Sequence, residues 1–188
     1  YPESNRLHKV MQWLSRESRR LGDDPEVRRH LGRAQCNDAY WHGVFGGLYL
    51  PFLRAALWHE LASAASLLQQ HRSLTGTRVD IDCDGDDEVL VRSARWLVVI
   101  APHRGGAIDV MLDLDQRFNW SDSLTRQDEA YHPLDEKVSV DDSTLPEDRP
   151  GTASIHEMEE QLTEVPPHDR EPRALLVDRF LVHDATRE

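Results

Sequence analysis

Residues 77–93, TRVDIDCDGDDEVLVRS, alternate polar and apolar side chains on both sides of the dipeptide Asp84-Gly85. Alternation with a period of two is typical of strands that bury one face, and Asp-Gly supplies the positive φ angles of a tight hairpin turn. A buried strand (RWLVVIAP, 95–102), a second turn (HRGG, 103–106) and a further strand (AIDVMLDL, 107–114) follow. Residues 77–115 therefore predict an antiparallel meander that opens a β domain.

The sequence before this meander has the period of helices. Residues 5–21 and 51–71 each carry an apolar stripe with spacings of three and four, and DDPEVRRHL (23–31) predicts a short helix with Pro25 in its first turn. The small residues of 51–71 would let another helix approach closely. We therefore predict the α+β class, with a helical bundle segment over residues 1–76 and a β domain over 77–188.

The later part of the β domain is less regular. Residues 121–152 are rich in acidic side chains and poor in large apolar ones, which predicts a long acidic excursion. IHEMEEQL (155–162) predicts a short helix, and RALLVDRFLV (173–182) predicts a strand or helix that needs a partner. Few strands make an open sheet, so this domain looks unfinished.

The charge balance limits the partners. A formal net charge of −12 disfavours nucleic acid and anionic membranes, because their phosphates would be repelled. The longest apolar runs are far shorter than a membrane span. The two cysteines, Cys36 and Cys83, do not form a CxxC pair, and reduced thiols agree with the cytoplasmic location that we expect.

Two stretches imitate metal motifs. Asp80, Asp82, Asp84 and Gly85 match the first half of an EF-hand loop, but the twelfth position, which needs a bidentate Glu, is Val91. Because the flanks are also strand-like, we interpret this stretch as a hairpin with a solvated acidic turn. His156-Glu157 would need a second His at Glu160 to form a zinc protease motif. We expect no metal and no cofactor.

The stretch NDAYWHGVFGG (37–47) is both aromatic and polar. Asn37 and Asp38 can cap a short helix, from whose first turns Tyr40 and Trp41 would project. An aromatic face beside a carboxylate suits sugars, because the ring stacks on apolar C–H groups while the carboxylate accepts hydroxyl hydrogen bonds. A helix junction packed by aromatic side chains is the alternative, and composition alone favours it.

The longer stretch AQCNDAYWHGVFGGLYLPFLR (34–54) resembles the fifth conserved region of glycoside hydrolase family 57, in its 4-α-glucanotransferase and α-amylase branch. YPESNRLHK (1–9) resembles the segment before that region. Weaker resemblances to the C-terminal β domain of the branch follow in the right order, at EAYH (129–132), ASIHE (153–157) and RALLVDRF (173–180). The resemblance thus runs over nearly the whole chain.

This resemblance implies a plan in which a β/α barrel carries the catalytic Glu and Asp. A helical region then closes one side of the active site, and a β-sandwich related to galactose mutarotase comes last. The chain would hold the helical region and the start of the sandwich, as a fragment without the barrel. No Asp or Glu here matches the catalytic motifs, so no catalytic residue is assigned and we expect the isolated chain to be inactive.

What the resemblance does assign is a substrate-lining role. Asp38 would bind glucose hydroxyls and Trp41 would wall the cleft, with Asn37, Tyr40 and His42 in supporting positions. The expected partners are an α-1,4-glucan or maltooligosaccharide and the missing barrel. Helix stripes that lack the barrel would be exposed, which predicts self-association into homo-oligomers. The alternative is a stand-alone, non-enzymatic module that binds carbohydrate or another protein.

Overall fold

The computed structural model describes residues 1–41, 46–69, 73–127 and 167–178. Its helices come first along the chain: α1 (Pro2–Arg20), α2 (Pro25–Arg33) and α3 (Pro51–Leu68). Each begins on a proline, whose fixed φ suits the first turn of a helix and whose missing N–H costs nothing there. The predicted helices are confirmed, although α1 starts three residues earlier than its apolar stripe indicated.

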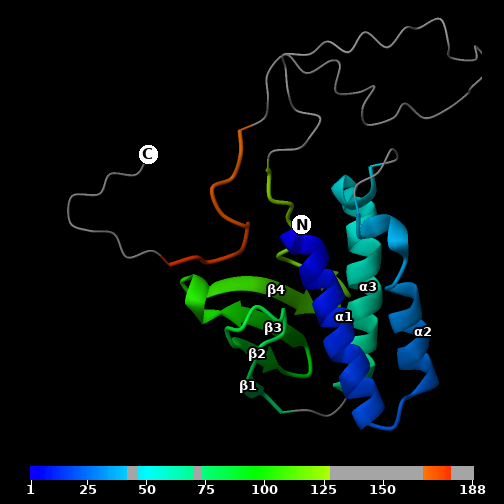
Figure 1. Cartoon of the computed structure of the whole chain (residues 1–188). Coiled ribbons are helices and arrows are strands. Elements are labelled where there is room, and N and C mark those ends of the chain that lie inside the picture. Colours follow the sequence, from blue (N-terminus) through cyan, green and yellow to red (C-terminus); the bar gives the residue numbers. More distant parts are fainter. Residues whose placement is uncertain (42–45, 70–72, 128–166, 179–188) are drawn as a thin grey trace, which may run out of the picture.

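An antiparallel sheet follows the helices and is a simple meander (Figure 1). Its strands are β1 (Thr75–Val79), β2 (Glu88–Arg92), β3 (Trp96–Ala101), β4 (Ala107–Asp113) and β5 (Phe118–Asn119), in that spatial order. Along β3, buried and half-buried side chains alternate, as a strand that covers a core on one face requires. The predicted meander and the α+β class are confirmed.

The turn predicted at Asp84-Gly85 is wrong in its length. Val79 pairs with Glu88, so residues 80–87 form an eight-residue loop between β1 and β2. The Asp80 carboxylate holds this loop, because it accepts hydrogen bonds from the backbone N–H groups of Asp84 (3.1 Å) and Gly85 (3.1 Å). Gly85 does have the positive φ expected of it, +100°.

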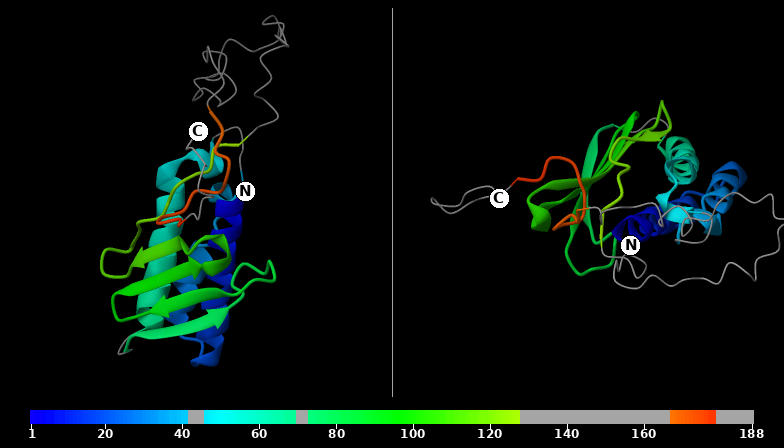
Figure 2. Two further views of the ribbon diagram at one scale, coloured as in Figure 1. Left: turned by 90° about the vertical axis from the view of Figure 1, so that its left-hand side faces the viewer. Right: turned by 90° about the horizontal axis from the view of Figure 1, so that it is seen from above.

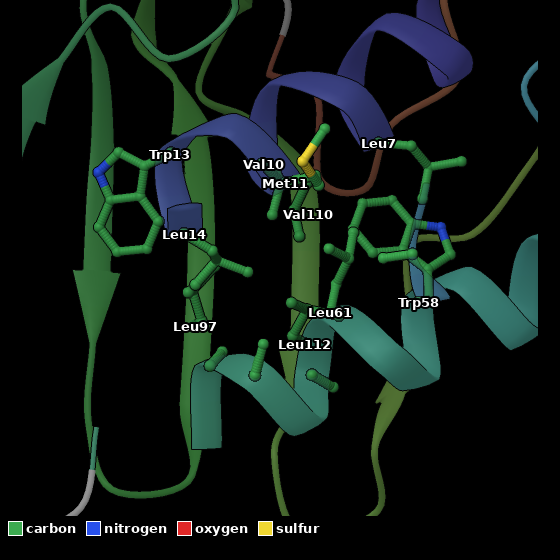
Figure 3. Close-up of a cluster of buried hydrophobic side chains, with 14 of the residues drawn as sticks. Leu7, Val10, Met11, Trp13, Leu14, Trp58, Leu61, Leu97, Val110 and Leu112 are labelled. Atoms are coloured by element: carbon green, nitrogen blue, oxygen red, sulfur yellow. The ribbon is translucent and has the colours of Figure 1, made fainter. Parts of the chain in front are cut away.

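The sheet and the helices share one hydrophobic core. Helices α1 and α3 cover one face of the sheet, and α2 packs beside α3 on the side away from the sheet (Figures 1 and 2). Figure 3 shows Leu14 of α1 and Leu61 of α3 close to Leu97 and Leu112 of the sheet, and all four are fully buried.

This core corrects one expectation. The apolar stripes of residues 5–21 and 51–71 were expected to be exposed for want of a barrel partner, but they are largely buried against the chain's own sheet. The physical basis for predicting self-association through these stripes is therefore removed. The division at residues 76 and 77 falls within β1 and stays a prediction.

Residues 167–178, near the end of the sequence, lie against β4 and against the segment that follows β5. Leu175 forms an isolated antiparallel bridge with Ile108 of β4, through N···O distances of 2.8 and 3.1 Å. Arg126 and Asp169 are joined by one bond between their backbones and one from backbone to side chain: Asp169 N–H donates to the Arg126 carbonyl (2.9 Å), and Arg126 N–H donates to the Asp169 carboxylate (2.8 Å). The segment that begins at residue 173 thus finds its partner in β4, but its described residues, 173–178, form this isolated bridge and not the predicted strand or helix.

Several predictions concern residues outside the described ranges. Most of the acidic excursion of 121–152 lies there, as do the helix predicted over 155–162 and the imitation zinc motif at His156. Within the described part there is one sheet, and the second layer of the expected sandwich is not among those residues. None of the described helices has the length and apolar character needed to cross a membrane.

Candidate functional site

The family-like stretch connects α2 to α3 through two short turns of 3₁₀ helix, at Asn37–Ala39 and Gly47–Tyr49. It lies where α1 and α3 begin (Figure 1). The start of α1 holds it at two places: the Ser4 hydroxyl donates to the Tyr40 carbonyl, and the hydroxyl groups of Tyr1 and Tyr49 are 2.8 Å apart. The connection is therefore fixed to the first turn of the chain.

Two glycines shape the exit from this stretch. Gly46 and Gly47 have φ values of +96° and +47°, in the left-handed region that favours glycine. The turn that they make brings the Leu48 N–H to the Trp41 carbonyl, 2.9 Å away. The Trp41 backbone is thus held in place by its carbonyl oxygen.

Tyr40 and Trp41 point in different directions, although they are neighbours in sequence. Tyr40 is half-buried against the helical core, donates its hydroxyl proton to the Ala34 carbonyl (2.6 Å) and meets the His8 ring edge-on at 6.3 Å. Burial raises the pKa of Tyr40 to about 12. These contacts make Tyr40 a packing residue at the junction, and the supporting position at the substrate that we predict for it stays a prediction.

Trp41 is exposed, and so are Asn37 and Asp38. Trp41 keeps 53% of its surface accessible, so it is not sealed under the helices. Asn37 and Asp38 lie within the first 3₁₀ turn, and the prediction that they cap it is wrong, because neither side chain makes a capping hydrogen bond. Among the described residues, the Asp38 carboxylate makes no hydrogen bond or ion pair. His42 lies outside those residues.

A buried arginine that sequence reasoning missed supports the second 3₁₀ turn. Arg54 Nη1 donates to the Leu48 carbonyl at 2.6 Å, and its Nε donates to Asp122 at 3.0 Å, so the turn is tied to the segment after β5. The sequence carried a signal: Arg54 lies three residues before Leu57 and seven before Leu61, on the apolar face of α3. A charged residue on such a face needs a buried partner.

Glu3 was missed as well. It is buried in the first turn of α1, and its Oε1 accepts hydrogen bonds from the backbone N–H and the hydroxyl of Thr125, the former at 2.8 Å. The two residues are 122 positions apart, so no local pattern announces the contact. It fixes the helix start on which the candidate site rests.

Comparison with known families matches two models in succession. Residues 1–68 match the middle domain of "Alpha-amylase/4-alpha-glucanotransferase", and residues 80–188 match its C-terminal domain. The order agrees with the helices and sheet described above.

Individual relatives agree with these models. The chain is 40% identical over 190 residues to an alpha-amylase of Pyrococcus abyssi and 38% identical over 190 residues to a 4-alpha-glucanotransferase of Thermococcus litoralis, and both alignments cover 99% of the chain. It spans 27% of the length of each of these relatives. The crystal structure of the Thermococcus litoralis 4-alpha-glucanotransferase superposes with a TM-score of 0.65 at 41% identity, over 71% of this chain and 20% of that one.

These matches cover nearly the whole chain and keep the same order of helical and β parts, so they establish homology. The chain belongs to the alpha-amylase/4-alpha-glucanotransferase family, glycoside hydrolase family 57.

Proposed function

We propose that this chain is part of a retaining enzyme that acts on α-1,4-glucans, and that residues 37–41 line its substrate cleft. The observation that carries the proposal is the exposure of both the Trp41 ring and the Asp38 carboxylate, on a turn whose Tyr40 and Trp41 carbonyls are held by Ser4 and Leu48. The relatives are named alpha-amylase or 4-alpha-glucanotransferase, which supports the glucan as the substrate class.

Each side chain has a distinct task in this proposal. The Trp41 indole stacks on the apolar C–H face of a glucose unit, while the Asp38 carboxylate accepts hydrogen bonds from its hydroxyl groups. Because the backbone at Trp41 is fixed by the Leu48 N–H, both contacts are preorganised and little freedom is lost when the sugar binds. Contacts of this kind place the scissile bond and can strengthen in the transition state.

The bond-breaking groups lie elsewhere in this proposal. Retaining glycosidases place two carboxyl groups about 5–5.5 Å apart, one as nucleophile and one as acid/base. By resemblance, both come from the barrel, so this chain supplies one wall of the cleft and closes it. The glycosyl unit held on the nucleophile then passes to a second glucan or to water.

The test is kinetic and uses a full-length enzyme that carries this chain. Trp41→Ala and Asp38→Asn should each lower kcat/KM for maltooligosaccharide disproportionation by about 10- to 100-fold, the size expected for a lost substrate contact. Trp120→Ala is the matched control, because Trp120 is an equally exposed tryptophan (57%) just after β5. If Trp41→Ala leaves both turnover and acceptor KM at the level of the control, the proposal is wrong.

A further inference from the structure

Carboxylates from two elements converge at the mouth of the β1–β2 hairpin. Asp80, Asp82 and Glu88 each offer an oxygen atom, and these atoms all lie within 4.8 Å of one another. Asp84, Glu88 and His103 form a second set with the same spacing, which shares Glu88 with the first. His103 lies in the turn between β3 and β4, so three separate parts of the sheet meet here.

Glu88 is the decisive member, because it is a buried carboxylate with one oxygen atom that accepts no hydrogen bond. The residue is only 1% exposed. Its Oε2 accepts the Ile81 N–H at 2.9 Å, but its Oε1 is buried and accepts no hydrogen bond. The His103 Nδ1 atom is 3.9 Å from Oε1, beyond hydrogen-bond range. A buried carboxylate oxygen without a hydrogen bond is costly and needs a partner.

The neighbouring arginines form their ion pairs with Asp109, which lies outside the cluster, although the Arg6 charge also acts on Asp82. Arg6 of α1 and Arg104 both bind Asp109, Arg6 at 3.0 Å. Within the described residues, Asp80, Asp82 and Glu88 form no ion pair with any lysine or arginine. His103 has its Nε2 3.6 Å from Asp84. Burial and the nearby Asp82 and Asp84 charges raise the pKa of Glu88.

We propose that Asp80, Asp82 and Glu88 bind a Ca²⁺ ion, with Asp84 at the edge of the site. Ca²⁺ takes hard oxygen ligands from mixed carboxylates and carbonyls in flexible geometry, and this set offers oxygen alone. The proposal departs from the expectation of no metal at this loop. That expectation rested on Val91 in place of the distal Glu, whereas the fold supplies the missing carboxylate from Glu88, at the start of β2.

The bound ion would stabilise the sheet where it meets the helices. It would join the loop of residues 80–87 to the first residue of β2, next to the Asp109 carboxylate that ties Arg6 of α1 to β4. Its role is therefore structural and independent of the sugar contacts at Trp41.

The test is calcium titration of the chain after treatment with a chelator, by calorimetry and thermal unfolding. The unchanged protein should bind one Ca²⁺ with a Kd between about 10⁻⁶ and 10⁻³ M, and Tm should rise by about 5 °C or more at saturation. Glu88→Gln keeps an oxygen for the Ile81 N–H but loses the charge. It should abolish the calcium response while leaving Tm in chelator equal to, or above, that of the unchanged protein.

Asp87→Asn is the matched control, since Asp87 is an exposed acidic residue of the same loop that belongs to neither set. It should keep the full calcium response, whereas Asp82→Asn should lose it. The absence of any calcium-dependent heat and Tm change overturns the proposal. So does an equal loss in Asp87→Asn, which would indicate diffuse attraction, and so does tighter Zn²⁺ binding that His103→Ala abolishes, which would assign the second set to a nitrogen-seeking metal.

Discussion

A β-carbon on Gly47 would lie much closer to the Trp41 carbonyl oxygen than van der Waals contact allows. Two parts of the backbone of the candidate site therefore approach each other so closely at Gly47 that only glycine fits there. Gly47 also has φ +47°, so a substitution there is strained by its conformation as well as by space. The position of the exposed indole depends on this second residue, six positions further along the chain.

Gly47→Ala should consequently lower the free energy of unfolding by about 1–3 kcal/mol and displace Trp41. Gly32→Ala is the control, because Gly32 lies in α2 with nothing within 4 Å of a new β-carbon, and it should stabilise by about 0.5–1 kcal/mol. Urea denaturation measures both. Equal effects of the two variants would show that the crossing at Gly47 is not tight.

The shared core makes a second prediction. Leu61→Ala removes a fully buried side chain between α3 and the sheet and should cost about 3 kcal/mol. Leu74→Ala, at a residue that is 74% exposed, should change stability by less than about 0.5 kcal/mol. Circular dichroism of the helices and tryptophan fluorescence should report one coincident transition. Two separate transitions would favour independent units divided near residue 76.

A third prediction concerns acid stability. The Arg95 guanidinium, 2.8 Å from the buried Asp113 carboxylate, lowers the pKa of Asp113 below its ordinary value of 3.8. Because the pKa of Asp113 is lower in the folded state, its ionised carboxylate stabilises the fold at pH values above its ordinary pKa. This contribution is lost as the pH falls through the folded-state pKa. Thermal unfolding between pH 7 and 2.5 should show a shallower acid loss in Asp113→Asn. Asp115→Asn removes an exposed charge from the same turn and should keep the full slope.

The isolated 188-residue chain should be inactive, since neither the described site nor the family resemblance supplies a catalytic carboxyl pair. Incubation with maltooligosaccharides should give no disproportionation, whereas a full-length relative under the same conditions should redistribute chain lengths. Product formation by the chain alone would place catalytic residues within it and refute the assignment of the chemistry to the barrel.

Periodicity in the sequence was enough to find the helices and the meander, because both report local geometry. It did not identify which apolar faces meet. The apolar faces of α1 and α3 were therefore expected to be exposed without the barrel, whereas they cover the sheet. Long-range contacts such as Glu3 with Thr125 were also out of reach.

The candidate site shows the same limit at close range. Resemblance pointed to Asp38 and Trp41 but could not show that Tyr40 turns inward while its neighbour faces solvent, since the 3₁₀ turn sets these directions. The prediction of a tight turn at Asp84-Gly85 was wrong for a related reason. Side-chain capture of backbone N–H groups by Asp80 opens the turn into a loop, and an alternating pattern does not reveal such bonds.

The hydrogen-bonded link between Arg126 and Asp169 has a consequence for how this fold can change in evolution. The polypeptide leaves at Arg126 and returns at Asp169, and the bonds between these two residues fix their separation however many residues lie between them. The entropic cost of closing such a loop grows only with the logarithm of its length. Family members can therefore gain or lose segments at this link while the sheet, the helices and the turn that carries Trp41 keep their places.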